Sequence, residues 1–315
     1  MDCNFARFAL GGIKFIINFS VPTKLEFYIA DTCRRNRLDR FLYEQITAVS
    51  RMYLYDLIRS GECRVNGETQ AGGYHLQAGD AVEIAVDLSA ETAMTPENIR
   101  LEIIFEDTEI LILDKPSGML VHPTKGVRSG TLLNALTYYL NYSKRDERLD
   151  ETFIRAGLVH RLDKKTSGLM VVAKNPQAHK ILSRHFQNKL VGKKYFAVVE
   201  GLIQEDSGTI DAPIGRDAEK RIWLITDDGK SAETNFRVIK KTADSTLLEL
   251  EPVTGRTNQL RLHCAHIGHP IVGDDKYGGR EYARLCLHAY KLSFHHPTDG
   301  RRLKFESPLP ADFPQ

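Results

Sequence analysis

Between residues 38 and 61 the apolar positions have the spacing of two short helices. Four of them lie three to four residues apart, on one face of a first helix: Leu38, Phe41, Leu42 and Ile46. Ser50 is a suitable cap for a second helix, which has apolar residues over 52–58 and ends at Gly61. Residues 63–67 then predict a strand entering an Asn-Gly turn, and residues 81–86 predict another strand. These elements indicate a small α+β unit.

From residue 99 onward, short apolar runs predict strands and longer periodic segments predict helices. The predicted strands cover residues 110–113, 169–173, 195–200, 234–239 and 246–250. The predicted helices cover residues 131–140, 177–190 and 258–267. Because the strands cluster as well as alternate with helices, we expect an α+β domain rather than a doubly wound α/β sheet.

Turn residues and composition divide the chain into four parts. We expect a tail of uncertain order over residues 1–20, a small domain over 21–88, a polar linker over 89–98 and a large domain over 99–315. The tail has few acids and a short apolar run, which fits a transit peptide, a strand or a misplaced translation start. A disordered tail is the interpretation that we favour.

Composition restricts the class of protein without naming a function. Of the 315 residues, 42% are hydrophobic, which is enough for a sizeable core. The five cysteines lie far apart, and their odd number argues against a disulfide framework, so we expect a cytoplasmic protein. No apolar run reaches the length of about 18 residues that a membrane helix needs.

The small net charge of +2 hides a local basic patch. Between residues 34 and 67 there are seven arginines against four acidic residues. Such patches attract phosphate backbones, although for the charge alone a solvated helix face is the better interpretation. The arginines that we expect to bind RNA from this patch are Arg37, Arg40, Arg51 and Arg59.

One aspartate stands out because cations surround it in the sequence. Asp163 follows His160 and Arg161 and precedes Lys164 and Lys165. Opposite charges nearby favour an ionised carboxylate. The turn formers over 166–168 and the apolar run over 169–173 predict that Asp163 lies on a short ordered turn leading into a core strand, although a surface salt bridge is the simpler interpretation of the charges.

A longer pattern extends this string. His-Arg-Leu-Asp-x-x-Thr-Ser-Gly, before an apolar strand, resembles the catalytic-aspartate motif of the RluA-type pseudouridine synthases. Further motifs of that family match in order at residues 114–123, 194–201, 255–263, 268–274 and 287–289. The resemblance implies a pseudouridine-synthase domain with a mostly antiparallel sheet and a central cleft. The basic segment before it resembles the small RNA-binding module named after the fourth small-subunit ribosomal protein, through Arg-Leu-Asp-Arg-Phe-Leu, Val-Asn-Gly and Gly-Asp-x-Val.

Pseudouridine formation breaks the bond from the ribose anomeric carbon to nitrogen-1 of uracil and joins carbon-5 to the same sugar carbon. A carboxylate beside that sugar carbon can act as nucleophile or as base, and the sequence does not choose between them. The resemblance implies that Asp163 is essential, that Tyr195 stacks on the base or relays the carbon-5 proton, and that Arg261 pairs with Asp163. Arg256 is expected to hold a phosphate and Arg161 to contact RNA. Without the motif, a core tyrosine would be the better interpretation of Tyr195.

A metal site is the rival interpretation of one cluster. His263, His266 and His269 recur every three residues, but on a helix this spacing spreads their side chains around the axis. We therefore expect packing or RNA-facing histidines, no metal and no cofactor. Lys115 and His122 are interpreted as loop residues near the cleft rim.

The sequence thus predicts an enzyme that isomerises uridines in structured RNA, most plausibly large-subunit ribosomal RNA. No obligatory protein partner is inferred. The alternatives are a transfer-RNA pseudouridine synthase and a non-catalytic protein that binds ribosomal RNA.

Overall fold

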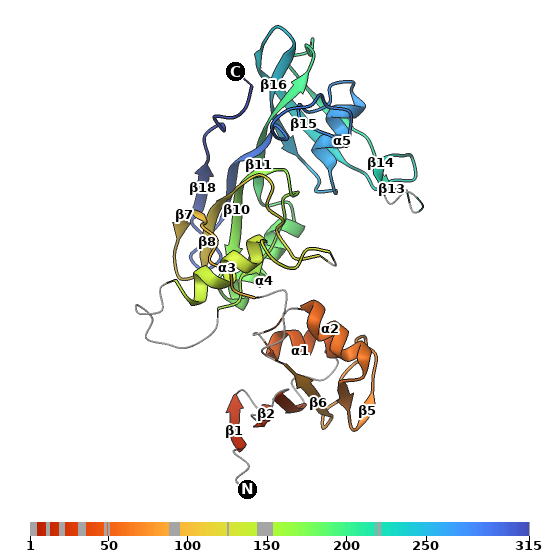
Figure 1. Cartoon of the computed structure of the whole chain (residues 1–315), viewed down its shortest axis with the longest axis vertical. Coiled ribbons are helices and arrows are strands. Elements are labelled where there is room, and N and C mark those ends of the chain that lie inside the picture. The colour runs from red at the N-terminus through yellow and green to blue at the C-terminus, as the bar shows by residue number, and fades with distance from the viewer. Residues whose placement is uncertain are drawn as a thin grey trace. The chain divides into compact units, whose positions relative to one another are not determined.

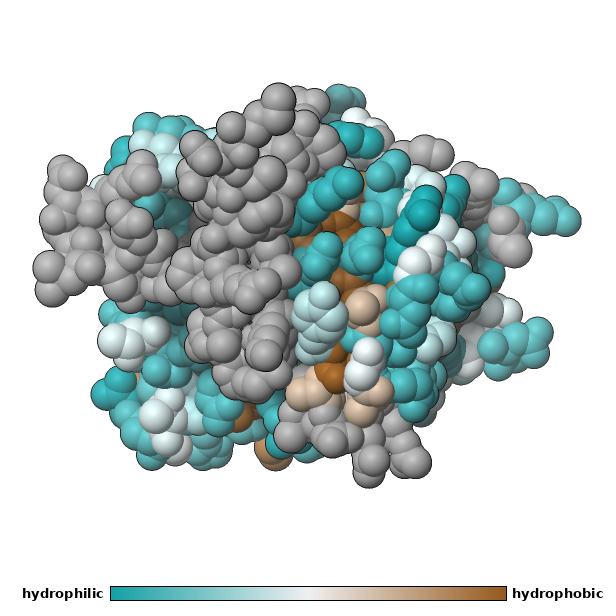
Figure 2. Space-filling model, turned by 90° about the horizontal axis from the view of Figure 1, so that it is seen from below, coloured by the Kyte–Doolittle hydropathy of each residue, from teal (hydrophilic) through white to brown (hydrophobic). Residues whose placement is uncertain are grey.

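The computed structural model describes the chain except for residues 1–4, 11–12, 19–22, 31–35, 47–48, 50, 88–94, 125, 144–153, 218, 220–221 and 315. The chain forms two compact units. One comprises Met1–Ile99 with His122–Arg155, and the other comprises Arg100–Val121 with Ala156–Gln315. No helix among the described residues is long and apolar enough to cross a membrane. In Figure 2 the described residues in view are mostly hydrophilic, and hydrophobic ones gather mainly near its centre.

Before residue 99, the first unit contains an antiparallel sheet and two short helices (Figure 1). Its strand order is β1-β2-β3-β6-β4-β5. The strands are β1 (Phe5–Leu10), β2 (Ile13–Asn18), β3 (Thr23–Tyr28), β4 (Cys63–Val65), β5 (Glu68–Thr69) and β6 (Ala81–Val86). The helices are α1 (Leu38–Gln45) and α2 (Arg51–Ser60). Their apolar faces bury Leu38, Phe41, Leu42 and Leu54 with Phe27 of β3 and Val82 of β6, as the apolar spacing predicts.

Two local features of this unit bear on the sequence predictions. The Asn66-Gly67 turn joins β4 to β5 with positive φ at both residues, and the Asn66 side chain bonds Asp80 and the Ala81 N–H, so the predicted turn is confirmed. The amino-terminal segment differs from the favoured disordered tail, because β1 and β2 pair with each other and β2 pairs with β3. Backbone pairing to the edge of an existing sheet orders a segment whose own pattern is weak.

Residues 122–155 group with the first unit by their contacts, and the boundary near residue 99 stays a prediction. They include helix α3 (Leu132–Asn141), capped by Thr131. Two bonds join the start of α3 to the preceding segment, from the Asn134 side chain to the Thr95 carbonyl (2.9 Å) and from the Gly130 N–H to the Glu97 carboxylate (2.9 Å).

At the end of the same segment, Arg155 attaches to α1. Its guanidinium lies 3.6 Å from the ring centroid of Tyr43 and donates to the carbonyls of Tyr43 and Val49, each at 3.1 Å. These contacts join residues more than a hundred positions apart, so sequence periodicity gives no sign of them.

The second unit is built on a ten-stranded sheet, mostly antiparallel (Figure 1). Its main path is β12-β15-β16-β11-β17-β10-β8-β7, with β18 beside β17 and β9 beside β10. The strands are β7 (Glu102–Glu106), β8 (Ile110–Lys115), β9 (Gly157–Leu158), β10 (Ser167–Ala173), β11 (Gly192–Glu200), β12 (Ser207–Asp211), β15 (Glu233–Lys241), β16 (Ser245–Pro252), β17 (Leu287–His295) and β18 (Arg302–Glu306). A small hairpin adds β13 (Ile214–Arg216) and β14 (Trp223–Ile225). The predicted α+β class is confirmed.

Two helices pack on this sheet. Helix α4 (Pro176–Gln187) lies against β9 and β10, and helix α5 (Gln259–His266) lies against β14 and β16. Asn175 caps α4 and accepts from the Ala178 N–H at 2.8 Å. All seven residues of β10 are buried, as expected for a central strand.

The two halves of the sheet meet where β10 runs parallel to β17 over only two residue pairs, Ser167 with His288 and Gly168 with Ala289. The approach is so close that a Cβ on Gly168 would lie 2.5 Å from the Ala289 backbone nitrogen. A buried polar chain crosses this junction, because Ser167 and Ser307 both hydrogen-bond the His288 ring, at 2.8 and 3.0 Å. Burial lowers the pKa of His288 to about 4, so the ring is neutral and can accept one of these bonds.

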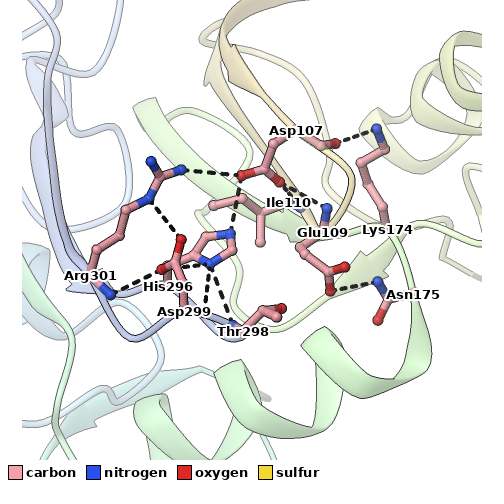
Figure 3. Close-up of polar contacts among 9 residues, drawn as sticks. All are labelled: Asp107, Glu109, Ile110, Lys174, Asn175, His296, Thr298, Asp299 and Arg301. Atoms are coloured by element: carbon pink, nitrogen blue, oxygen red, sulfur yellow. Dashed lines mark hydrogen bonds and ion pairs between the residues drawn. The ribbon is translucent and has the colours of Figure 1, made fainter.

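A polar network around Asp107 connects the β7–β8 turn with the segment before α4 and with the β17–β18 turn (Figure 3). The Asp107 carboxylate accepts from two backbone N–H groups of the β7–β8 turn, each at 2.8 Å, and lies 3.1 Å from His296 Nε2. Its carbonyl accepts from Lys174 Nζ at 2.6 Å, and Arg301 lies 3.8 Å from its carboxylate. The β7–β8 turn, the segment before α4 and the β17–β18 turn are therefore held together.

We predict that Gly168→Ala destabilises the second unit strongly, because Gly168 has a φ of 121° and no space for a methyl group. The backbone strain and the steric overlap should lower the free energy of unfolding by more than about 3 kcal/mol and the melting temperature by at least about 6 °C. Gly255→Ala is the matched control, since nothing lies within 4 Å of its Cβ position. Calorimetry of both variants checks this, and equal melting temperatures would contradict it.

Candidate active site

Asp163 lies on the loop that connects β9 to β10. Its carbonyl accepts from the Thr166 N–H at 3.1 Å, which closes a turn directly before the buried strand. The turn after β8 is bonded to the same loop, because the Gly118 N–H donates to the Lys164 carbonyl (2.8 Å) and the Ser117 hydroxyl donates to the Lys165 carbonyl (2.7 Å). The predicted ordered turn is confirmed, and Asp163 is held by more than its own segment.

Lys115, at the end of β8, is the residue that the sequence interpretation placed wrongly. It is fully buried rather than at the rim, and its ammonium donates to the carbonyls of Pro116 (2.8 Å), Met119 (2.9 Å) and Lys164 (3.3 Å). Burial lowers its pKa to about 8, against the charge of Asp163, which raises it. Lys115 therefore braces the loop that carries Asp163 and places a positive charge near its carboxylate.

Burial and neighbouring charges shift the pKa of the Asp163 carboxyl in opposite directions. Burial raises its pKa, whereas the charges of Arg261, Arg161 and Lys115 lower it and the charge of Asp274 raises it further. The net direction is upward, so burial outweighs the cations that the sequence expected to dominate. Within the described part of the chain, no hydrogen-bond or ion-pair partner is found for this carboxylate, which leaves it available to a ligand.

Tyr195 lies on β11 and lines the same cavity as Asp163. Burial, and then the charge of Asp163, raise the pKa of its phenol well above the usual value. On the β17 side the pairing shifts between Lys194 and Phe196, so two residues of β17 face Tyr195 alone. Irregular pairing of this kind redirects side chains and occurs often beside active sites.

Arg261, on α5, is close to Asp163 but is not hydrogen-bonded to it, which corrects the direct pairing that we expected. Its guanidinium makes a two-bond fork with the fully buried Asp274, at 2.7 and 2.6 Å. Asp274 also accepts from the N–H groups of Lys276 and Tyr277. The Arg261 charge still reaches Asp163, and of the charges that lower the Asp163 pKa it is the largest. Asp274 therefore positions Arg261, a role that residue spacing does not reveal.

A cavity of about 970 Å³ brings these residues together. Asp163, Tyr195 and Arg261 line it, and so do the predicted RNA-binding residues Arg161 and Arg256. Its walls also carry Lys189, Lys193 and Arg302. Glu251 is the other acidic side chain on the walls, but it is half exposed and lies 3.6 Å from Lys194. The cavity is therefore rich in positive charge around one unpaired carboxylate.

The remaining predicted RNA-binding arginines lie on or beside the helices of the first unit. Arg37 pairs with Asp39 at 2.7 Å, Arg40 pairs with Glu44 at 3.0 Å, and Arg59 is exposed. The side chain of Arg51 lies outside the described residues.

The three histidines have separate surroundings. His263 is buried and its Nε2 lies 3.1 Å from the Ala212 carbonyl, whereas His269 Nδ1 lies 2.7 Å from the Glu200 carbonyl. His266 is exposed on α5. Among the described residues, no group of three or more histidine, cysteine or acidic side chains is placed to hold a metal ion.

Residues 109–266 match the RNA pseudouridylate synthase family. The chain belongs to this family. It is therefore an RNA pseudouridine synthase, an isomerase whose substrate is RNA, and the resemblance found in the motifs is confirmed at this level.

Individual pseudouridine synthases are similar over most of the chain. The Bacillus subtilis protein named uncharacterized RNA pseudouridine synthase YlyB is 41% identical, across 92% of this chain and 95% of its own. The Pseudomonas aeruginosa protein named ribosomal large subunit pseudouridine synthase D is 40% identical, across 88% and 89%. The solved human RNA pseudouridylate synthase domain containing 1 superposes with a TM-score of 0.56 at 31% identity, covering 68% of this chain and 85% of that one.

We predict that Asp163 titrates above an ordinary aspartate, whose pKa is about 3.9, and that Arg161→Gln raises its pKa further. Arg161 is exposed, so the variant should fold, and its charge is one of those that lower the Asp163 pKa. Lys164→Gln is the matched control, because this exposed neighbour is not among the causes of the shift. Carbon-13 NMR titration checks this, with the Asp163 signal assigned by its loss in Asp163→Asn. A pKa at or below the ordinary value would contradict the burial argument.

Proposed function

We propose that this pseudouridine synthase modifies uridines of large-subunit ribosomal RNA and that Asp163 is its catalytic residue. One observation carries the assignment to Asp163. It is the carboxylate on the cavity wall that is surrounded by cations and yet has no bonded partner in the described part of the chain. A catalytic carboxylate has to remain free to meet the sugar carbon, and a braced loop keeps it in place for that encounter.

The surroundings suit the chemistry of the reaction. The bond from the anomeric carbon to nitrogen-1 breaks, the sugar carbon becomes electron-poor, and an anionic carboxylate stabilises it by attack or by charge. After carbon-5 has bonded to the sugar carbon, its proton has to leave. An aspartate whose pKa is raised by burial is a better proton acceptor than an exposed one, so both roles remain open to Asp163.

Tyr195 and Arg261 serve this carboxylate in different ways. The Tyr195 phenol keeps its proton at neutral pH, because burial and the Asp163 charge disfavour a phenolate. We assign it the face on which the uracil stacks and a neutral hydroxyl beside it. Arg261 is locked by Asp274 and acts as a fixed positive charge that favours the ionised form of Asp163.

The target uridine has to leave its stack to reach Asp163, since the reacting atoms are not accessible inside a helix. Arg161 and Arg256 line the cavity and are assigned to phosphate contacts, which position the RNA without reading its sequence. Among the described residues the Arg256 guanidinium makes one hydrogen bond, from Nε to the Ser231 carbonyl (3.0 Å), so its remaining donors are available to a ligand.

The choice of ribosomal RNA rests on the relatives. The Pseudomonas aeruginosa protein acts on the large ribosomal subunit by its name, and its similarity extends through both units of this chain. The first unit is proposed as an RNA-binding element. Its groove is lined by Tyr55 and Arg59, an aromatic and a cation that suit stacking and phosphate contact, and Tyr55 is 50% exposed.

We predict that Asp163→Asn lowers the rate of pseudouridine formation by at least about 10³-fold, because it removes the anionic oxygen and keeps the shape. RNA affinity should be retained. Glu251→Gln removes the other acidic group of the cavity wall and should remain active. Single-turnover assays on large-subunit RNA fragments check this, and an active Asp163→Asn would refute the assignment.

Mapping pseudouridines in cells with and without the gene tests the target RNA, and a loss restricted to transfer RNA would overturn the ribosomal proposal.

We also predict that reversing Arg51 and Arg59 to Glu weakens RNA binding about tenfold and makes it less dependent on salt, because each lost phosphate contact lowers the slope of log affinity against log salt by about 0.7–0.9. The matched control reverses one exposed cation on the sheet of the same unit, Lys24→Glu, and should change both quantities less. Filter binding over a salt series measures the effect. Unchanged affinity and slope would mean that these arginines are only a solvated face.

A further inference from the structure

Two adjacent lysines on β11 have opposite surroundings. Lys194 pairs with Glu249 at 2.8 Å and lies 3.6 Å from Glu251. The hydrogen bond and charge of Glu249 raise its pKa. Lys193 lines the catalytic cavity and has no acidic partner within ion-pair distance among the described residues.

The position of Lys193 follows from strand geometry. Side chains two residues apart project from the same side of a strand, so Lys193 and Tyr195 share one side and Lys194 lies on the other. Both Lys193 and Tyr195 line the cavity, and Lys194 does not. On β17, Lys193 pairs with the buried Leu292.

The electrostatic surroundings of Lys193 contain no internal counter-ion. Burial lowers its pKa, and no neighbouring carboxylate acts in the other direction. Its charge is felt by the buried His160, three residues before Asp163, whose Nε2 accepts from the Val171 N–H at 3.0 Å. That bond requires a neutral acceptor nitrogen, so His160 cannot neutralise Lys193 and adds no charge of its own.

A partly buried cation without a partner is costly in the free protein, and an anion that enters the cavity reverses that cost. The family's RNA substrate brings such an anion wherever a nucleotide enters, because each nucleotide carries a backbone phosphate. A base that stacks on Tyr195 leaves its own ribose phosphates within reach of the same side of β11. The long lysine side chain suits contact with a phosphate as a point charge.

We propose that Lys193 binds the backbone phosphate directly next to the target uridine and so positions the flipped nucleotide over Asp163. The proposal rests on the proposed site at Asp163 and Tyr195. It adds a subsite that neither the motifs nor the predicted RNA-binding arginines contain, and it assigns to Lys193 a role different from that of its neighbour.

The test compares Lys193→Met, Lys193→Arg and the matched control Lys194→Met on an RNA hairpin with one target uridine. A lost charged hydrogen bond should raise KM and Kd about tenfold to a hundredfold in Lys193→Met. The slope of log affinity against log salt should fall by about 0.7–0.9. Lys193→Arg should restore most of the affinity because it restores the charge. Lys194→Met should leave the slope unchanged.

A second arm changes the RNA instead of the protein. In the test RNA, a neutral methylphosphonate replaces the phosphate next to the target uridine, and the adjacent 2′-hydroxyl is methylated. The control RNA carries the same 2′-O-methyl group and keeps the natural phosphate. The wild-type protein should lose affinity on the neutral RNA, whereas Lys193→Met should lose little more, because both changes remove the same contact. Additive losses, or an unchanged salt slope in Lys193→Met, would overturn the proposal.

These binding arms do not depend on turnover, so they separate this proposal from the proposed function. If the wild-type protein binds the hairpin but forms no pseudouridine, the target assignment fails while the contact of Lys193 is still decided by the two binding comparisons. If Lys193→Met unfolds at a lower temperature than the wild-type protein, Lys193→Gln replaces it, and its affinity is compared with the affinity that the wild-type protein loses on the methylphosphonate RNA.

Discussion

The Lys164 carbonyl accepts hydrogen bonds from the Gly118 N–H and from the buried Lys115 ammonium, and the site depends on this junction. Residues 115–118 and 163–165 are far apart in the chain, and hydrogen bonds between them hold the two segments together. Joined to each other, and followed by the fully buried β10, they place the Asp163 carboxylate on a rigid support. Catalysis by a single carboxylate needs such support, because a displacement of about 1 Å from the reacting carbon costs a large factor in rate.

The charged residues near Asp163 act in two steps, one through hydrogen bonds and one through charge. Asp274 is fully buried and fixes Arg261 through a two-bond fork, and Arg261 in turn acts on Asp163 through its charge alone. A direct fork between Arg261 and Asp163 would occupy the carboxylate oxygens that the proposed reaction needs. With Asp274 as the fixed partner, the arginine stays in place while Asp163 remains free, and burial keeps the carboxylate more basic than an exposed one.

The cavity walls extend this division between paired and unpaired cations. Lys194 has its acidic partners on the other side of β11, whereas Lys193, Arg161 and Arg256 line the cavity with no acidic partner among the described residues. Unpaired cations of this kind raise the local potential and favour a polyanion such as RNA. The closely paired strands β10 and β17, which only a glycine at position 168 permits, bring the Asp163 loop and the Tyr195 strand to the same cavity.

The sequence alone determined many of the elements and singled out Asp163 as the candidate catalytic residue. Apolar runs and helical spacing located β8, β10, β11, β15, β16, α3, α4 and α5, because local periodicity records which face of an element is buried. The motif around Asp163 identified the family and the ordered turn. Only the tertiary structure decided what the local patterns do not show: the buried position of Lys115 against the Lys164 carbonyl, the Arg261–Asp274 fork, the attachment of residues 122–155 to the first unit, and the strands formed near the amino terminus. A hydrogen bond or ion pair between two different segments leaves no periodic trace in either of them, so the single sequence does not reveal it.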